Sequence, residues 1–275
     1  FVGNSYLYYN DSIHNHVERM LIEYYEDQNI ITKSATIGGS RLHNHNIDHL
    51  LDYKNLQLDR QIDLLIMQGG SKEVTTSELR SKFSKTVVNF SRKAQRMGIK
   101  TSLYMTHAYL ENDPRYEPDL INKIELAYYD AGEKSNSSVI PVGLAYEMAY
   151  DERPNIKLHH PDGTHPGLLG TYLGSCVVFA SITGNSPEGI KYNYLDQIPK
   201  EDLYFLQKIA WKAYLKHKKQ YNKQSISLII SKNENKLSIV LGVTDDITDI
   251  FDASKEIREI SIILGGKGGG GRKDL

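Results

Sequence analysis

The segment Ile62-Asp63-Leu64-Leu65-Ile66-Met67-Gln68-Gly69-Gly70 is a short apolar run closed by two glycines. Such a run is typical of a strand that is buried in a parallel sheet and then enters a loop. The amphipathic pattern over residues 75–97 predicts a long helix that ends at Gly98, and residues 100–105 are predicted to form the next strand. Strand, loop, helix and strand in this order indicate one unit of an α/β fold.

The same alternation extends in both directions from this unit. Further helices are predicted over residues 11–27, 42–53, 118–134, 167–182 and 201–221, and further strands over 30–37 and 139–142. The pattern predicts an α/β sandwich with a mostly parallel sheet, in which ligands bind at the carboxyl ends of the strands. We expect three glycine-containing loops at that rim, since each follows a strand directly: Gly3-Asn4-Ser5, Gly38-Gly39 and Gly69-Gly70.

The composition is that of an ordinary globular protein. Hydrophobic residues make up 40% and charged residues 24% of the 275 residues, and the formal net charge is −1. A charge so close to zero gives no electrostatic reason to expect nucleic-acid or membrane binding. No stretch reaches the ~20 apolar residues of a membrane span. The one cysteine, Cys176, excludes an internal disulfide and lies in an apolar run, where a buried, inert thiol is expected.

The sequence leaves the compartment and the oligomeric state open. No signal peptide is visible, and Phe1-Val2 has the character of the end of a strand. A bacterial cytoplasmic location and an exported one are both compatible with this pattern, because exported bacterial enzymes often lack disulfides as well.

Two short motifs far apart in the chain carry the chemistry of acyl transfer. Gly3-Asn4-Ser5 lies at a strand-to-helix turn, and Asp162-Gly163-Thr164-His165-Pro166 precedes a helix late in the α/β region. Acyl transfer needs a hydroxyl, a base that takes its proton and a carboxylate that orients the base. Asp162 and His165 can supply the last two from one loop. A serine on a tight turn is exposed to substrate, and its own backbone N–H can donate to an oxyanion.

Together with these motifs, Gly38-Gly39-Ser40 and the segment 66–71 resemble the blocks of the SGNH/GDSL hydrolase superfamily across roughly residues 1–222. The resemblance implies a flavodoxin-like three-layer fold and hydrolysis of carboxylic esters without a cofactor, on a small ester or an acetylated carbohydrate. It assigns Ser5, Asp162 and His165 to the catalytic triad and Gly39 to the oxyanion hole. An uncharacterised bacterial branch is closer still, on the stretches 38–42, 103–106, 139–143 and the helix after His165.

The third block departs from the family pattern Gly-x-Asn-Asp, because Lys72 stands where the oxyanion-hole Asn is expected. The Gln68 amide, or a backbone N–H at Gly70 or Ser71, is a candidate replacement. Loss of one such donor typically removes about 3 kcal/mol of transition-state stabilisation, so an active enzyme needs one. The departure also leaves an alternative open, namely a catalytically decayed scaffold that binds carbohydrate or nucleic acid.

Histidines offer competing interpretations. His43, His45 and His49 form a dense group, and neutral imidazole is a common zinc ligand. Their spacing does not place all three on one helical face, so no metal site is predicted, and cleft lining is the other candidate role. His107 follows a strand and is expected to line the cleft.

The neighbours of the two motifs have less specific roles. His159 and His160 precede the catalytic loop and are expected to shape it rather than react. Tyr6, Tyr8 and Tyr9 follow Ser5, and tyrosine rings suit contact with sugars or aryl esters. They are equally compatible with an ordinary position at the edge of the core.

A second domain is predicted over about residues 226–275. It contains two strands, 227–230 and 237–241, joined by a turn at 232–235, and a helix over 253–262, which make a small α+β fragment. Residues 241–246 and the glycine-rich segment 264–275 resemble the C-terminal DHHA1-type domain of alanyl-tRNA synthetases. In that family the domain helps contact tRNA. Because the synthetase catalytic and editing regions are absent, tRNA contact is not assigned on this resemblance.

Overall fold

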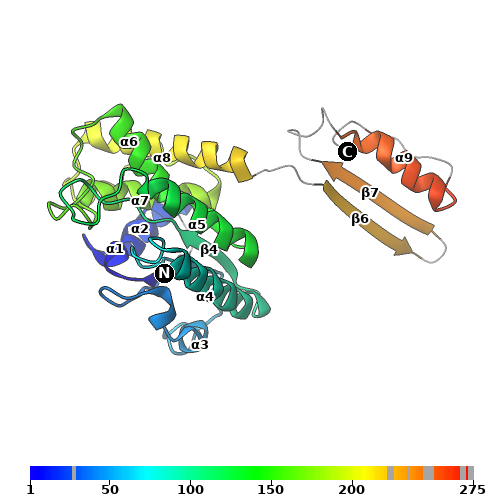
Figure 1. The fold of residues 1–275 in the computed structure, drawn as a ribbon, viewed down its shortest axis with the longest axis horizontal. Coiled ribbons are helices and arrows are strands. Elements are labelled where there is room, and N and C mark those ends of the chain that lie inside the picture. The colour runs from blue at the N-terminus through cyan, green and yellow to red at the C-terminus, as the bar shows by residue number, and fades with distance from the viewer. Residues whose placement is uncertain (27–28, 222–225, 234–235, 244–250, 267–270, 272–275) are drawn as a thin grey trace. The chain divides into compact units, whose positions relative to one another are not determined.

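The computed structural model describes residues 1–26, 29–221, 226–233, 236–243, 251–266 and 271. The chain forms two compact units, Phe1–Tyr214 and Leu215–Leu275 (Figure 1). The sequence predicts a boundary at about residue 222. This position belongs to the segment 222–225, which lies outside the described residues. Each unit is described here by itself.

A parallel five-stranded sheet forms the centre of the first unit. Its strand order is β2-β1-β3-β4-β5. The strands are β1 (Val2–Gly3), β2 (Ala35–Thr36), β3 (Leu64–Met67), β4 (Lys100–Tyr104) and β5 (Ser138–Ile140). This is the flavodoxin-like order, in which the topological switch point lies beside β1. The predicted α/β sandwich with a mostly parallel sheet is confirmed.

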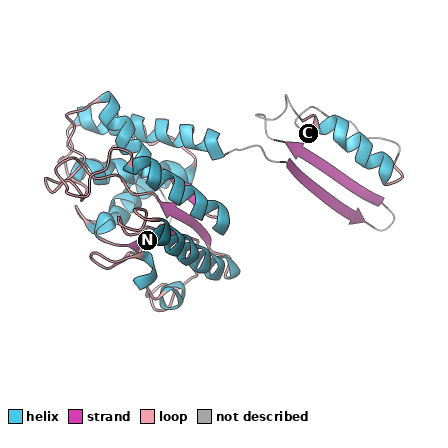
Figure 2. Ribbon diagram, in the orientation of Figure 1, coloured by secondary structure: helices cyan, strands magenta, loops and turns pink. Residues whose placement is uncertain are grey.

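Helices cover both faces of this sheet (Figure 2). One core contains α2 (Ile13–Tyr25), α6 (Val142–Glu152), α7 (Leu168–Thr183) and α8 (Lys200–Tyr221), and the other contains α3 (Ile47–Leu51), α4 (Ser77–Arg96) and α5 (Leu120–Ser135). Strand side chains alternate between the two cores, as the pleat requires. Ile66 packs in the first core, whereas Leu65 and Met67 pack in the second.

Helix α7 lies deepest in the first core. Its residues Gly170 to Ala180 are all buried, which agrees with its continuous apolar sequence. Cys176 lies among them, fully buried as the sequence predicts. Burial raises the pKa of the Cys176 thiol well above its ordinary value. The thiol therefore stays protonated and does not compete as a nucleophile.

Some elements differ from the sequence prediction. Strand β2 contains only Ala35 and Thr36, so the apolar residues 30–32 lie outside it. The predicted strand 139–142 ends at Ile140, and helix α6 begins directly after Pro141. Proline has no N–H for a strand ladder but fits a helix start, which explains the early change. The predicted helix 42–53 is a 3-10 turn, Leu42–Asn44, followed by α3.

The second unit contains an antiparallel hairpin of β6 (Ile226–Asn233) and β7 (Lys236–Val243), followed by helix α9 (Ala253–Ile263). Two parts of the predicted pattern, residues 244–246 and most of the glycine-rich segment, lie outside the described residues. Among the helices that the structure describes in both units, none has the length and apolar character needed to cross a membrane.

Replacing Phe179 by Ala tests the packing of α7. Phe179 is fully buried and meets the Tyr24 ring edge-on at 5.3 Å. Removal of a buried phenyl group leaves a cavity, so we expect a loss of about 3–5 kcal/mol in the free energy of unfolding. Urea unfolding followed by the fluorescence of Trp211, the one tryptophan of the chain, measures it. Leu126→Ala, at a helical side chain that is 70% exposed, is the control and should change stability by less than about 0.5 kcal/mol. Equal effects of the two changes would contradict this account of α7.

Candidate active site

Ser5 is held at the point where β1 turns into the short helix α1 (Ser5–Tyr8). Asn4 caps this helix, because its side-chain Oδ1 accepts the backbone N–H of Tyr6 at 3.1 Å. The backbone N–H of Asn4 donates to Gln68 Oε1 at 2.9 Å, in the loop after β3. The turn is thus fixed from both sides, and Ser5 itself is the first residue of the helix.

The loop before α7 holds an acid and a base together. Asp162 Oδ1 accepts the backbone N–H groups of Thr164 and His165, each at 2.9 Å. Gly163 between them has a φ of +74°, a conformation that glycine adopts without strain. Its carbonyl accepts the N–H of Leu110 at 2.9 Å, which attaches the loop to the segment after β4.

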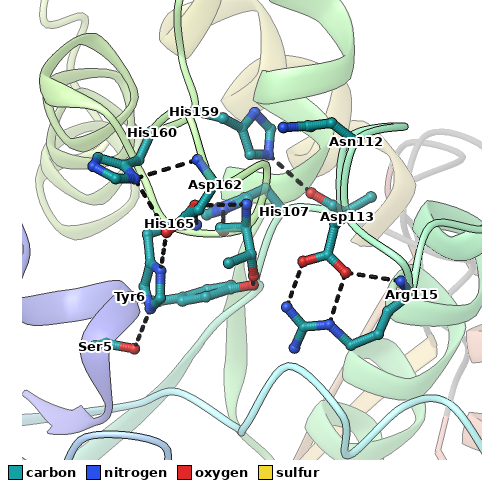
Figure 3. Close-up of polar contacts among 12 residues, drawn as sticks. Ser5, Tyr6, His107, Asn112, Asp113, Arg115, His159, His160, Asp162 and His165 are labelled. Carbon is teal, nitrogen blue, oxygen red and sulfur yellow. Dashed lines mark hydrogen bonds and ion pairs between the residues drawn. The ribbon is translucent and has the colours of Figure 1, made fainter.

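The structure brings Ser5, His165 and Asp162 into one chain of hydrogen bonds (Figure 3). His165 Nε2 lies 2.9 Å from Ser5 Oγ, and His165 Nδ1 lies 2.7 Å from Asp162 Oδ2. A carboxylate only accepts, so Nδ1 carries the proton and Nε2 is left to accept the Ser5 hydroxyl. The His165 side chain is 24% exposed, which leaves the site open to a ligand.

Asp162 is kept ionised by its surroundings. Burial by itself would raise the pKa of Asp162, but the N–H groups of His165 and Thr164 and the His165 ring outweigh it. They hold this pKa well below its ordinary value of 3.8. His160 lies beside the same carboxylate, with Nδ1 at 3.1 Å from Asp162 Oδ2. His160 thus shapes the carboxylate environment without reaching Ser5.

A tyrosine covers the His165 imidazole. The Tyr9 ring stacks on the His165 ring at 4.3 Å between centroids, with an angle of 6° between the planes. Asn10 connects the same segment to the loop that contains Asp162 and His165, because its Nδ2 donates to the Pro166 carbonyl at 2.9 Å. The sequence marked Tyr9 only as one of three nearby tyrosines, since no local pattern places it on His165.

Buried aromatic rings support the loop from inside the fold. The His107 ring lies between the rings of Tyr6 and Tyr146, at 4.6 and 4.4 Å. His107 Nε2 donates to the Thr164 carbonyl at 2.8 Å, and the Tyr6 and Thr164 hydroxyls share a hydrogen bond of 2.8 Å. Burial, and then the nearby His159, lower the pKa of His107 well below 6.5, so it stays neutral. The expectation that His107 lines the cleft is wrong, because it is 2% exposed and lies beneath Tyr6.

His159 belongs to the same support. Its Nδ1 lies 2.7 Å from the Tyr150 hydroxyl, and its Nε2 lies 2.9 Å from the Ala108 carbonyl. Both ring nitrogens are therefore engaged with the protein. His159 shapes the loop and has no nitrogen left for a reaction.

The expected oxyanion donors fall into two groups. Gly39 has a φ of +66°, and its N–H meets no hydrogen-bond acceptor among the described residues. Gln68 is different, because its Oε1 accepts from Asn4 and its Nε2 donates to the Gly69 carbonyl. The Gly70 N–H donates to Glu73 Oε2 at 2.6 Å. As the structure places them, Gln68 and Gly70 are engaged and do not offer the donors that the sequence predicts.

The clustered histidines take separate roles. His45 is buried and lies 3.2 Å from Ser40 Oγ, which supports the Gly39 loop. His43 Nδ1 lies 3.8 Å from Glu73 Oε1, and the backbone N–H of His49 donates to Asn46 Oδ1 at 3.3 Å. Within the described ranges, no group of three or more His, Cys, Asp or Glu side chains could hold a metal ion.

Several solved structures share the fold of this chain. A DUF4886 family protein from Bacteroides uniformis matches with a TM-score of 0.63 and 18% identity, over 78% of this chain and 93% of that chain. A candidate SGNH hydrolase from Slackia heliotrinireducens matches at 0.52 and 21%, over 66% and 96%. The lipase/acylhydrolase from Enterococcus faecalis matches at 0.52 and 16%, over 66% and 94%. The first unit has the SGNH/GDSL hydrolase fold. These matches confirm the fold that the predicted resemblance implies. In this chain, Ser5 follows the first strand of the fold, β1.

Curated relatives match only a short stretch of the chain. Alanine–tRNA ligases match from Gluconobacter oxydans, with 51% identity over 47 residues, and from Rhodopseudomonas palustris, with 45% over 58 residues. The match spans 17% and 21% of this chain, but only 5% and 6% of the ligases. None of the protein-family models matches the chain. These relatives agree with the resemblance predicted for residues 226–275. A match of this length gives no reason to assign ligase activity to the first unit.

Replacing Asp162 by Asn tests the lowered pKa. A carboxyl group whose pKa is lower in the folded chain binds fewer protons when folded. Its stabilising effect is complete above the unfolded pKa of about 3.9 and is lost as the pH falls through the folded pKa. We expect wild type to be more stable than Asp162→Asn at about pH 6, by a difference that shrinks below about pH 4. Urea unfolding across this range measures the difference, and a constant difference would contradict the lowered pKa.

Proposed function

We propose that the first unit is a serine hydrolase that cleaves carboxylic esters. The observation that supports this most directly is the hydrogen-bonded chain from Ser5 through His165 to Asp162, at 2.9 and 2.7 Å. The SGNH fold supports the same proposal, because these three residues come from segments that the fold brings to one rim of its sheet.

The proposed reaction follows the acyl-enzyme route. Ser5 Oγ attacks the ester carbonyl while His165 Nε2 takes its proton, and Asp162 stabilises the imidazolium that forms. His165 then passes the proton to the leaving alcohol, and an acyl group remains on Ser5. A water molecule, activated by the same imidazole, hydrolyses this acyl-enzyme and restores Ser5. The three side chains supply every proton transfer, so the route uses no cofactor.

Backbone donors are proposed for the oxyanion. The N–H groups of Ser5 and Gly39 have no acceptor within the described chain; Ser5 begins α1, and Gly39 lies in the loop after β2. Of the candidate replacements for the family Asn, Gln68 and Gly70 are engaged, whereas the Ser71 N–H has no acceptor among the described residues. We therefore assign the third donor to Ser71. Donors held in place in this way act on charge that develops in the transition state.

The surroundings of the triad favour an alcohol part with a flat apolar face. Tyr8 and Tyr9 stack at 5.7 Å, and Tyr9 continues the stack onto His165. The Tyr8 side chain is 41% exposed. Exposed aromatic rings beside a nucleophile suit a sugar ring or an aryl group. An O-acetylated carbohydrate is the substrate class that we propose on this basis.

A decayed scaffold that only binds ligand is the alternative, and Lys72 in place of the family Asn is the observation that favours it. The complete triad argues against it, because a decayed site has no reason to keep three side chains at hydrogen-bond distance. Hydrolysis by the purified chain separates the two functions.

Replacing Ser5 by Ala tests the hydrolase directly. The change removes the nucleophile, so we expect kcat for p-nitrophenyl acetate hydrolysis to fall by at least about 10³-fold. Ser175→Ala is the matched control, since Ser175 is a buried serine of α7 whose hydroxyl donates to the Thr171 carbonyl. The control should stay within about 2-fold of wild type. Equal rates for wild type and Ser5→Ala would remove the hydrolase proposal in favour of the binding scaffold.

A further inference from the structure

A buried carboxylate joins the two loops that follow β2 and β3. The Glu73 side chain is 2% exposed. Its Oε2 accepts the backbone N–H of Gly70 at 2.6 Å and that of Leu42 at 3.1 Å. We propose that Glu73 is a positioning residue, which holds the oxyanion-hole loops in register beside Ser5. This inference rests on the hydrolase function proposed above.

The chemistry of Glu73 supports a role beyond packing. Burial of a carboxylate is unfavourable unless hydrogen bonds compensate for the lost water, and N–H donors to an ionised oxygen are the strong kind. Only one oxygen of Glu73 is used in this way, because Oε1 has no hydrogen-bond partner among the described residues. His43 Nδ1 lies 3.8 Å from that oxygen. A buried charge of this kind contributes little net stability compared with an apolar residue, but it fixes the direction of two N–H groups.

The loops joined by Glu73 carry the proposed oxyanion donors. Gly39 lies three positions before Leu42, and Ser71 follows Gly70. The backbones of the two loops touch, since a Cβ added to Gly70 would lie 3.0 Å from the Ser40 carbonyl oxygen. That carbonyl also accepts Asn4 Nδ2 at 3.0 Å, one residue before the nucleophile. Movement of either loop would therefore displace the donors relative to the Ser5 hydroxyl.

Two substitutions separate the reach of Glu73 from its charge. Glu73→Gln keeps the length and an oxygen that accepts both N–H groups, so we expect kcat for p-nitrophenyl acetate within about 3-fold of wild type. Glu73→Asp keeps the charge but is shorter by one methylene and cannot span both loops. A displacement of about 1 Å in an active site costs up to about 10²-fold, so we expect kcat to fall by about 10- to 100-fold. KM should stay within about 3-fold, because oxyanion donors act mainly on the transition state.

A matched control exists on α2, which packs in the other core of the same unit. Glu23 of α2 also accepts two backbone N–H groups, those of Lys191 at 2.6 Å and Tyr192 at 2.8 Å. Glu23→Asp shortens this second carboxylate in the same way, at partners that are not part of the proposed site. We expect it to leave kcat within about 2-fold while lowering the melting temperature.

The outcomes distinguish this inference from the proposed function. Hydrolysis by wild type that is lost in Ser5→Ala, with normal kcat in Glu73→Asp, overturns the role of Glu73 alone. A loss of kcat in Glu73→Gln as large as that in Glu73→Asp also overturns it, since a neutral side chain of full length would then not be sufficient. If Glu73→Asp fails to fold, Glu73→Gln still decides, because a fall of more than about 10-fold in its kcat contradicts the expected rescue. If wild type does not hydrolyse the ester, both the hydrolase function and the role of Glu73 are contradicted.

Discussion

The hydrogen bond between Ser5 Oγ and His165 Nε2 joins two side chains that are 160 positions apart in the chain. At 2.9 Å it demands that two distant loops be placed within a fraction of an ångström, and each loop is held by its own local bonds. Asn4 caps the helix that begins with Ser5, and Asp162 binds the backbone and the ring of His165. Each partner is thus oriented before the two meet, so little ordering remains for the moment of reaction.

The sheet topology explains why these loops meet. In the order β2-β1-β3-β4-β5, strand β1 lies between β2 and β3, so the segments after all three open at one rim. Ser5 follows β1, Gly39 follows β2, and Gly70 follows β3. The loop that contains Asp162 and His165 lies directly before α7 and reaches this rim through the hydrogen bond of His165 to Ser5. The stacked rings of Tyr6 and His107 lie beneath it and link it to the α1 turn.

The sequence predicts the parts of the site that depend on motif and strand order. Ser5, Asp162 and His165 could be named in advance as candidates, because their residue types and their positions, Ser5 after a strand and the other two before a helix, carry the information. The engagement of Gln68 and Gly70 could not, since it depends on partners such as Glu73 that only the folded chain brings close.

The limits of the fold prediction have the same cause. The sequence predicts the alternation of strands and helices from periodicity, which is a local property. Burial of His107 under Tyr6 and the start of α6 directly after Pro141 depend on contacts between distant segments or on a single backbone constraint. Neither feature can be predicted from the periodicity of apolar residues.

The central claim is that the imidazole of His165 activates the hydroxyl of Ser5 for attack. The most direct measurement is the reaction of the purified chain with a fluorophosphonate, followed by peptide mass spectrometry of the adduct. The account predicts one phosphonyl group on Ser5 in wild type and a rate of labelling at least about 10³-fold lower in His165→Ala. Absence of an adduct, attachment at a different serine, or equal labelling in the two proteins would contradict it.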